Sequence, residues 1–183
     1  MASPTDYRFA GTAANVDRDS KTAWSSIDYA KADDTNYAQP YSIYKNDYGD
    51  WLRLTNFGFT STHIPEGATI TGIEFVICRD GRAADRCNDS ALYLYANGAV
   101  GNNLASATKW PSTEGTATYG GPTDMCGTSL TQSDIVANTF GVQLSVAWGA
   151  EGITFLVDYI KIRIYFTEGG GATVKPHYYY LQQ

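Results

Sequence analysis

The stretch Ile153–Phe166, ITFLVDYIKIRIYF, decides the fold class, because its side chains alternate in character along the chain. Isoleucine occupies every second position from Ile160 to Ile164, whereas Lys161 and Arg163 fall between them. Successive side chains of a β-strand point to opposite faces of its sheet. The pattern therefore predicts one long strand whose isoleucine side faces the protein core.

Other segments show the same alternation, or a short apolar run bounded by turns. They are Trp51–Phe57, Thr69–Arg79, Ala91–Ala96 and Phe140–Ala147. Short strands separated by turn signals such as Asn97-Gly98 predict an all-β fold, an antiparallel β-sandwich of the jelly-roll or Ig-like kind. The expected inner face consists of these apolar residues: Ile73, Phe75, Ile77, Leu92, Leu94, Val142, Leu144, Ile160, Ile162 and Ile164.

One short helix is expected in addition to the strands. Thr131-Gln132-Ser133-Asp134 is similar to a capping box, with Asp134 in place of the usual glutamate. In such a box the first and fourth side chains bond each other's backbone N–H groups. We therefore predict one helical turn over Gln132–Ala137.

The chain has 183 residues, which fits a single domain with tails. We expect an extended N-terminal arm with the first strands over residues 1–49 and the β-sandwich over residues 50–167. A glycine linker and a tyrosine-rich C-terminal arm follow over residues 168–183. The expected contacts of this arm with an assembly partner are Tyr178, Tyr179, Tyr180 and Leu181.

The composition argues against two classes of partner. Only 17% of the residues are charged, and the formal net charge is −6, which gives nucleic acid no electrostatic footprint. The sequence holds no apolar run of about 18 residues, so no membrane partner is expected. The first residues, Met1–Asp6, have neither a basic region nor an apolar region, and we expect synthesis in a cytoplasm without a signal peptide.

The sequence offers little that points to catalysis. Its two histidines, His63 and His177, lie beside a turn and in the tail, where no acid is positioned to orient them as in a catalytic triad. No motif for zinc proteases, nucleotides or paired-cysteine chemistry occurs. Asp158 lies within the long apolar strand, and we expect it to accept backbone N–H groups of a neighbouring loop rather than to catalyse. A non-enzymatic protein without cofactor or metal is therefore expected.

Two features leave alternatives open. Asp17 and Asp19 have the spacing of some Ca²⁺ loops, to which Asp33 and Asp34 would add oxygens, but a solvated acidic loop fits the same residues. The three cysteines are Cys78, Cys87 and Cys126. They fit small buried hydrophobes, although Cys78 and Cys87 would also pair as a disulfide if they faced each other across a hairpin.

The aromatic residues also fit several uses. The four tryptophans are Trp24, Trp51, Trp110 and Trp148, and there are 14 tyrosines. Such rings stack on sugars, fill a β-core or form protein interfaces, and the sequence does not separate these uses.

A series of short motifs between residues 50 and 167 resembles a β-sandwich module of tailed-phage virion proteins. The motifs are LRLTNFGF at Leu52–Phe59, IPEGATITGIEF at Ile64–Phe75, Asp89 with Leu92-Tyr93-Leu94, Trp110-Pro111, Tyr119-Gly120-Gly121, Asp124-Met125-Cys126-Gly127, Leu130-Thr131 with Asp134-Ile135, Phe140-Gly141-Val142, and VDYIKI at Val157–Ile162. That module occurs on decoration, tail and fibre proteins alike, so the resemblance implies a fold and a virion rather than one role. The pattern usually has tryptophan where this chain has Cys126.

The resemblance implies a bacteriophage virion structural protein that is made in the host cytoplasm. Within that class we expect a capsid decoration, or cement, protein that binds the outer capsid surface and bridges neighbouring subunits with its arms. Its partners would be the major capsid protein or other virion proteins, together with further copies in a homo-oligomer. The alternative is a tail, baseplate or fibre component whose β-sandwich binds a glycan.

Overall fold

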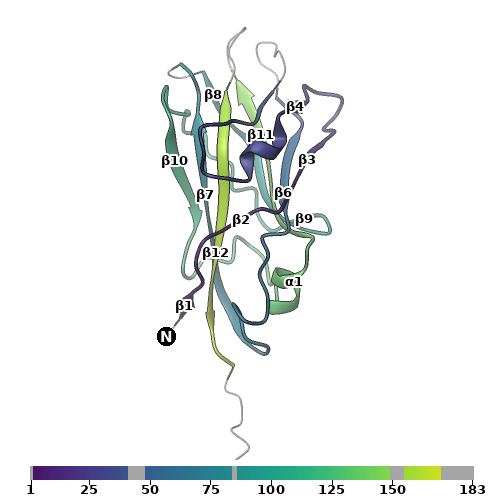
Figure 1. Cartoon of the computed structure of the whole chain (residues 1–183), viewed down its shortest axis with the longest axis vertical. Coiled ribbons are helices and arrows are strands. Elements are labelled where there is room, and N and C mark those ends of the chain that lie inside the picture. Colours follow the sequence, from purple (N-terminus) through teal and green to yellow (C-terminus); the bar gives the residue numbers. More distant parts are fainter. Residues whose placement is uncertain (1, 41–47, 84–85, 149–154, 170–183) are drawn as a thin grey trace, which may run out of the picture.

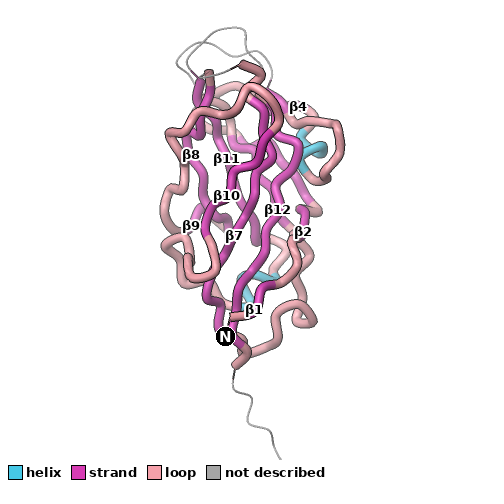
Figure 2. Tube along the Cα trace, turned by 90° about the vertical axis from the view of Figure 1, so that its left-hand side faces the viewer, coloured by secondary structure: helices cyan, strands magenta, loops and turns pink. Residues whose placement is uncertain are grey.

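The computed structural model of the chain describes residues 2–40, 48–83, 86–148 and 155–169, and these residues form a sandwich of two antiparallel sheets (Figures 1 and 2). The first sheet has the order β1 (Ser3–Pro4), β12 (Leu156–Thr167), β7 (Thr69–Asp80), β10 (Gly115–Gly120), and β2 (Arg8–Phe9) also pairs with β12. The second sheet has the order β3 (Thr12–Val16), β6 (Trp51–Thr55), β11 (Phe140–Trp148), β8 (Cys87–Ala96), β9 (Ala99–Val100).

Three smaller pieces complete the described structure. Strands β4 (Trp24–Ser25) and β5 (Gln39–Pro40) pair with each other, and the 3₁₀ helix η1 (Ile27–Ala30) lies between them in the chain. The predicted helical turn is α1 (Gln132–Val136), which has the expected capping box: Asp134 N–H donates to the Thr131 hydroxyl, and Thr131 N–H donates to the Asp134 carboxylate.

The predicted core is confirmed. The ten apolar residues expected on the inner face are Ile73, Phe75, Ile77, Leu92, Leu94, Val142, Leu144, Ile160, Ile162 and Ile164, and each of them is fully buried between the sheets. The predicted long strand is β12, which is described from Leu156; the first residues of the expected strand, 153 and 154, lie outside the described residues.

A charged network also lies inside the sandwich. The Asp89 carboxylate accepts hydrogen bonds from Arg79 Nη1 (2.8 Å), Trp110 Nε1 (2.8 Å), the Tyr119 hydroxyl (2.6 Å) and the Ser106 backbone N–H (2.9 Å). Asp89 is 3% exposed and Arg79 is 5% exposed. Two residues of the quoted motifs, Trp110 and Tyr119, thus bond the buried carboxylate of a third, Asp89, which explains their presence as a requirement of the fold.

The N-terminal segment, expected as an extended arm with the first strands, contributes short strands to both sheets. Strands β1 and β2 pair with β12 of the first sheet, and β3 pairs with β6 of the second sheet. Much of the segment before residue 41 is therefore part of the sandwich, because its short strands cover sheet edges that would otherwise expose unpaired backbone groups. The predicted contact residues of the C-terminal arm, Tyr178, Tyr179, Tyr180 and Leu181, lie outside the described residues.

The cysteine alternative is also resolved. Cys78, Cys87 and Cys126 are all free and buried. Cys78 and Cys87 do not face each other across a hairpin, because β7 belongs to the first sheet and β8 to the second. Cys87 packs into the main core, whereas Cys78 lies on the outer side of the first sheet with Val76 and Tyr159.

Among the described residues, no helix has both the length and the apolar character needed to cross a membrane.

Candidate functional site on the outer face of the second sheet

The central strand of the second sheet, β11, has small and polar residues on its outer side, and they are buried: Gln143 is 4% exposed and Ser145 is 0% exposed. Its inward residues are apolar and buried, so the residues between them, Gly141, Gln143 and Ser145, belong to the outer face. A Cβ atom at Gly141 would come within 1.9 Å of the Leu54 carbonyl oxygen of β6, so only glycine fits there. The small residues leave room over β11 for the larger side chains of the flanking strands.

One row of polar and aromatic side chains crosses these strands. The register pairs Gln143 of β11 with Arg53 of β6 on one side and with Tyr93 of β8 on the other. Arg53 donates from both Nε (3.2 Å) and Nη2 (3.1 Å) to the Gln143 amide oxygen. This leaves the Gln143 amide N–H₂ and Arg53 Nη1 without a hydrogen-bond acceptor among the described residues.

Aromatic rings lie on both sides of this row. The Trp51 and Tyr93 rings make an edge contact with centroids 6.1 Å apart, and both residues are half-buried. The Arg53 guanidinium lies 4.0 Å from the centroid of the Tyr95 ring. Contacts of these kinds hold the rings in fixed orientations. The three strands therefore carry an aromatic and hydrogen-bonding surface, hereafter the β6–β11–β8 face.

A second arginine closes one end of this face. The Arg18 guanidinium lies 4.6 Å from the Trp51 ring centroid and 4.1 Å from that of Tyr48. Its Nη1 donates to the hydroxyls of Ser145 (2.6 Å) and Ser90 (3.0 Å). Arg18 comes from the segment after β3, which the pairing of β3 with β6 carries to this end of the sheet.

Neither guanidinium of the β6–β11–β8 face has an ion-pair partner within the part of the chain that the structure describes. The carboxylates near Arg18 serve other groups. Asp50 is 4% exposed and accepts from the backbone N–H of Arg18 and the side chain of Asn15. Asp19 accepts from the Tyr48 hydroxyl at 3.1 Å. Both arginines thus keep their full positive charge beside neutral partners.

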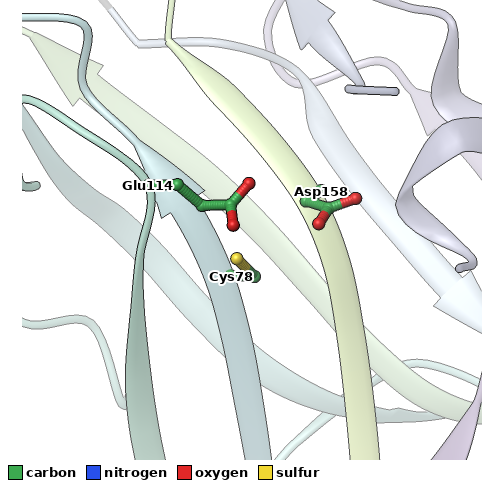
Figure 3. Close-up of side chains that lie close together, drawn as sticks. All are labelled: Cys78, Glu114 and Asp158. Atoms are coloured by element: carbon green, nitrogen blue, oxygen red, sulfur yellow. The ribbon is translucent and has the colours of Figure 1, made fainter. Parts of the chain in front are cut away.

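A separate cluster of titratable groups lies on the outer side of the first sheet (Figure 3). Cys78 of β7, Glu114 beside β10 and Asp158 of β12 place their ligand atoms within 4.8 Å of one another. A bulge in β12 between Val157 and Tyr159 sets Asp158 off the regular ladder. A thiol with two carboxylates is a donor set that Zn²⁺ accepts.

The chain itself engages these carboxylates. Asp158 Oδ1 accepts from the Asp34 backbone N–H at 3.3 Å, as expected from the sequence, and Glu114 accepts from the Tyr37 hydroxyl at 2.9 Å. Bridges from Lys31 to Tyr159 and from Ala38 to Val157 bind the same loop to β12. We therefore interpret the cluster as the anchor of the 31–38 loop on the first sheet.

Burial makes Asp158 and Cys78 of this cluster weaker acids than they are in water. Burial raises the pKa of Asp158 to about 6, and the nearby carboxylates of Glu114, Asp33 and Asp34 act in the same direction, against the hydrogen bond from Asp34 N–H. Burial also raises the pKa of the Cys78 thiol to about 12. At neutral pH the thiol is protonated and therefore a poor nucleophile.

The other residues considered in the sequence have structural surroundings. Asp17 accepts from Ser20 N–H at 3.0 Å, and Asp33 and Asp34 lie instead beside Asp158, so the proposed calcium loop does not assemble. The ring nitrogens of His63 contact Arg8 and Thr60, with no acid as partner. His177 lies outside the described residues.

The tryptophans divide between two uses that the sequence left open. Trp24 and Trp110 are buried and pack edge-on against Phe155 in the core. Trp51 lies on the outer face of the second sheet, and the Trp148 side chain is outside the described part. Sequence reasoning missed Arg18, Arg53 and Gln143 as members of a site. The only signal for Arg53 and Gln143 was their outward parity on β6 and β11.

Comparisons with known proteins concern the fold alone. No protein-family model matches this sequence, and a search of curated proteins finds no similar sequence. Similar solved structures include a family 4 carbohydrate-binding module, with 14% identity and a TM-score of 0.41 over 86% of this chain and 94% of that chain. A family 29 carbohydrate-binding module from Piromyces equi has 8% identity and a TM-score of 0.40 over 88% of this chain and 90% of that chain.

Proposed function

We propose that this protein is a non-enzymatic, glycan-binding β-sandwich of a tailed-phage virion, of the kind carried by a tail, baseplate or fibre. One observation carries the glycan part: the β6–β11–β8 face combines half-buried aromatic rings with guanidinium N–H groups and with the amide of Gln143, which is 4% exposed. The virion part is supported by the resemblance of residues 50–167 to the phage module.

The chemistry of sugars fits such a face. A pyranose ring presents C–H groups on its flat sides and hydroxyl groups around its rim. Rings such as Trp51 and Tyr93 offer apolar surfaces to the flat side. The Gln143 amide and Arg53 Nη1 offer donors to the rim hydroxyls, and a few directional groups of this kind give a binding site its specificity.

The test is binding of the purified protein to a panel of soluble polysaccharides, measured by affinity electrophoresis and then by calorimetry. We expect retarded migration on at least one polysaccharide, and loss of that retardation in Trp51→Ala and Tyr93→Ala. The matched control is Tyr29→Ala, which removes an aromatic side chain that is 46% exposed on η1, away from this face. Binding that survives both face substitutions, or no binding to any polysaccharide, contradicts the proposal.

A second candidate is a capsid decoration protein, which one further surface favours. On the outer side of the first sheet, Arg163 lies 4.5 Å from the Tyr7 ring centroid, and Lys161 lies 4.8 Å from that of Tyr159. Phe9, which packs edge-on against Tyr159, is 38% exposed. Tyrosine and arginine are enriched where proteins bind proteins, and the major capsid protein would be the partner.

This second candidate predicts that the protein attaches specifically to emptied capsids. The attachment is measured by co-sedimentation and by electron microscopy. Two variants report on it: Phe9→Ala on the first sheet, and deletion of residues 172–183, which removes Tyr178, Tyr179, Tyr180 and Leu181. We expect both variants to remain folded and to occupy capsids at lower density than the unchanged chain. Capsid occupancy that is zero for the unchanged chain, or equal for all three proteins, argues against decoration.

A further inference from the structure

We propose that the ligand of the β6–β11–β8 face is an acidic saccharide, one whose sugar rings carry carboxylate or sulfate groups. This inference rests on the proposed glycan-binding function and narrows it to one chemical class. The feature that carries it is the pair of arginines, Arg18 and Arg53, which flank the aromatic rings without a carboxylate partner in the described chain.

The two arginines place positive charge on one face of an acidic chain. The chain has 13 Lys and Arg against 19 Asp and Glu, a net charge of −6. Some basic side chains, such as Arg79 and Arg163, pair with acids at 2.8 Å and 2.7 Å, whereas Arg18 and Arg53 have no ion pair among the described residues. An acidic protein that keeps two guanidiniums free of carboxylates on one face produces a local positive field there.

The two guanidiniums are also held in place. Ser145 and Ser90 accept from Nη1 of Arg18, and Gln143 accepts from Nε and Nη2 of Arg53. These acceptors are neutral, so they orient each guanidinium without cancelling its charge. Arg53 Nη1, and Nε and Nη2 of Arg18, have no acceptor in the described ranges and are the donors for an anionic oxygen. Guanidinium groups match carboxylate and sulfate oxygens better than they match a neutral hydroxyl.

The carboxylates at the Arg18 end of the face accept hydrogen bonds from neutral donors and form no ion pair with Arg18. Lys21 also lies at this end, 4.9 Å from the centroid of the Tyr48 ring. The negative groups at that end are Asp17, Asp19 and Asp50. Asp17 accepts from the Ser20 backbone N–H, Asp19 accepts from the Tyr48 hydroxyl, and Asp50 is buried under its own hydrogen bonds. No carboxylate of the described chain lies within ion-pair distance of Arg53.

The experiment compares polymers that differ only in charge. One pair is polygalacturonate and its fully methyl-esterified form, and the other is dextran sulfate and dextran. We expect binding of at least one charged member with a dissociation constant at least about tenfold lower than that of its neutral partner, and weaker binding as salt increases. The two pairs distinguish carboxylate from sulfate as the anionic group.

Two variants locate the effect, and one controls for it. Arg53→Gln and Arg18→Gln should each weaken binding of the charged polymer about tenfold or more, and by a clearly larger factor than they weaken binding of the neutral polymer. Lys161→Gln removes one positive charge beside tyrosine rings on the opposite sheet, and should change neither. Thermal unfolding of each variant shows that it is folded, and Arg53→Lys, which keeps the charge, should recover part of the affinity.

The outcomes separate this inference from the proposed function. Equal affinity for charged and neutral members, with loss of both in Tyr93→Ala, overturns the acidic ligand and leaves the glycan-binding function intact. No binding to either member of either pair, or to any polysaccharide of the panel, overturns both. Binding of single-stranded DNA as tightly as the charged polysaccharide overturns the inference, because the face would then select charge without a sugar.

Discussion

Replacing Asp89 with alanine removes the acceptor at the centre of the buried network between the two sheets. The carboxylate accepts four hydrogen bonds, from Arg79, Trp110, Tyr119 and the backbone of Ser106, at 2.6 to 2.9 Å. The side chain of Asp89 is 0% exposed and that of Arg79 is 6% exposed. The substitution therefore leaves a buried guanidinium without its counter-charge.

The magnitude follows from that uncompensated charge. Removing one partner of a buried ion pair costs about 3–5 kcal/mol of unfolding free energy. The phenol of Tyr119 and the indole N–H of Trp110 also lose their acceptor, and each such unsatisfied donor costs about 1–3 kcal/mol when nothing relaxes. These costs are not additive within one network, so we expect a total of about 4–6 kcal/mol.

The assay is urea unfolding followed by tryptophan fluorescence, with thermal unfolding as a second measure. A loss of about 4–6 kcal/mol corresponds to a midpoint lowered by about 8–24 °C in a domain of this size. Asp28→Ala is the control: Asp28 also pairs with a basic residue, Lys31, but is 73% exposed, and should change stability by less than about 1 kcal/mol. The double variant Arg79→Met/Asp89→Leu should recover part of the loss, because no buried charge remains. An Asp89→Ala protein as stable as the control would refute this account of the network.

Three further predictions follow from the same structure. Ile162→Ala removes a fully buried side chain and should lower the unfolding free energy by about 2–5 kcal/mol in urea titration, whereas a loss below about 1 kcal/mol would contradict the strand register. The folded pKa of Asp158 is raised from 3.8 to about 6, so its protonated form stabilises the fold below pH 4 and that contribution is lost as pH rises through 6. Asp158→Asn should therefore be about 1–3 kcal/mol more stable than the unchanged chain at pH 8 and equal to it near pH 4; the reverse order of stability at pH 8 would show a favourable charged carboxylate. The thiols of Cys78, Cys87 and Cys126 are buried, with pKa values raised to about 12, so a thiol reagent at pH 8 should label none in the native protein and three after denaturation.

The candidate site was less predictable than the fold. The outward parity of Trp51, Arg53 and Gln143 followed from the alternation along their own strands. Their meeting on one face required the pairing of β11 with both β6 and β8, strands that are far apart in the sequence. Arg18 lies outside any regular strand, and its place over Trp51 depends on β3 having joined the edge of the same sheet. The sequence does not encode such a pairing in any local pattern.

The role of Asp158 was accessible from the sequence, because an isolated acid within an apolar strand needs hydrogen-bond donors wherever the chain supplies them. The neighbours of Asp158 could not be predicted from the sequence, because Asp34, Glu114 and Cys78 come from three other segments. The alternative of a disulfide between Cys78 and Cys87 is excluded for a related reason. It required the two segments to form a hairpin, but β7 and β8 belong to different sheets.

By itself the sequence determined strands β6, β7, β8, β11 and β12, the inward residues from Ile73 to Ile164 and the capped turn at Thr131. Each of these depends on a period of two residues or on contacts within four residues, so the local order of side chains is sufficient. Only the tertiary structure decided which strands pair, how the N-terminal segment closes the sheet edges, and which polar groups meet at Asp89 and on the β6–β11–β8 face. Those outcomes depend on burying apolar faces and satisfying backbone groups across the whole chain at once, and no single segment specifies them.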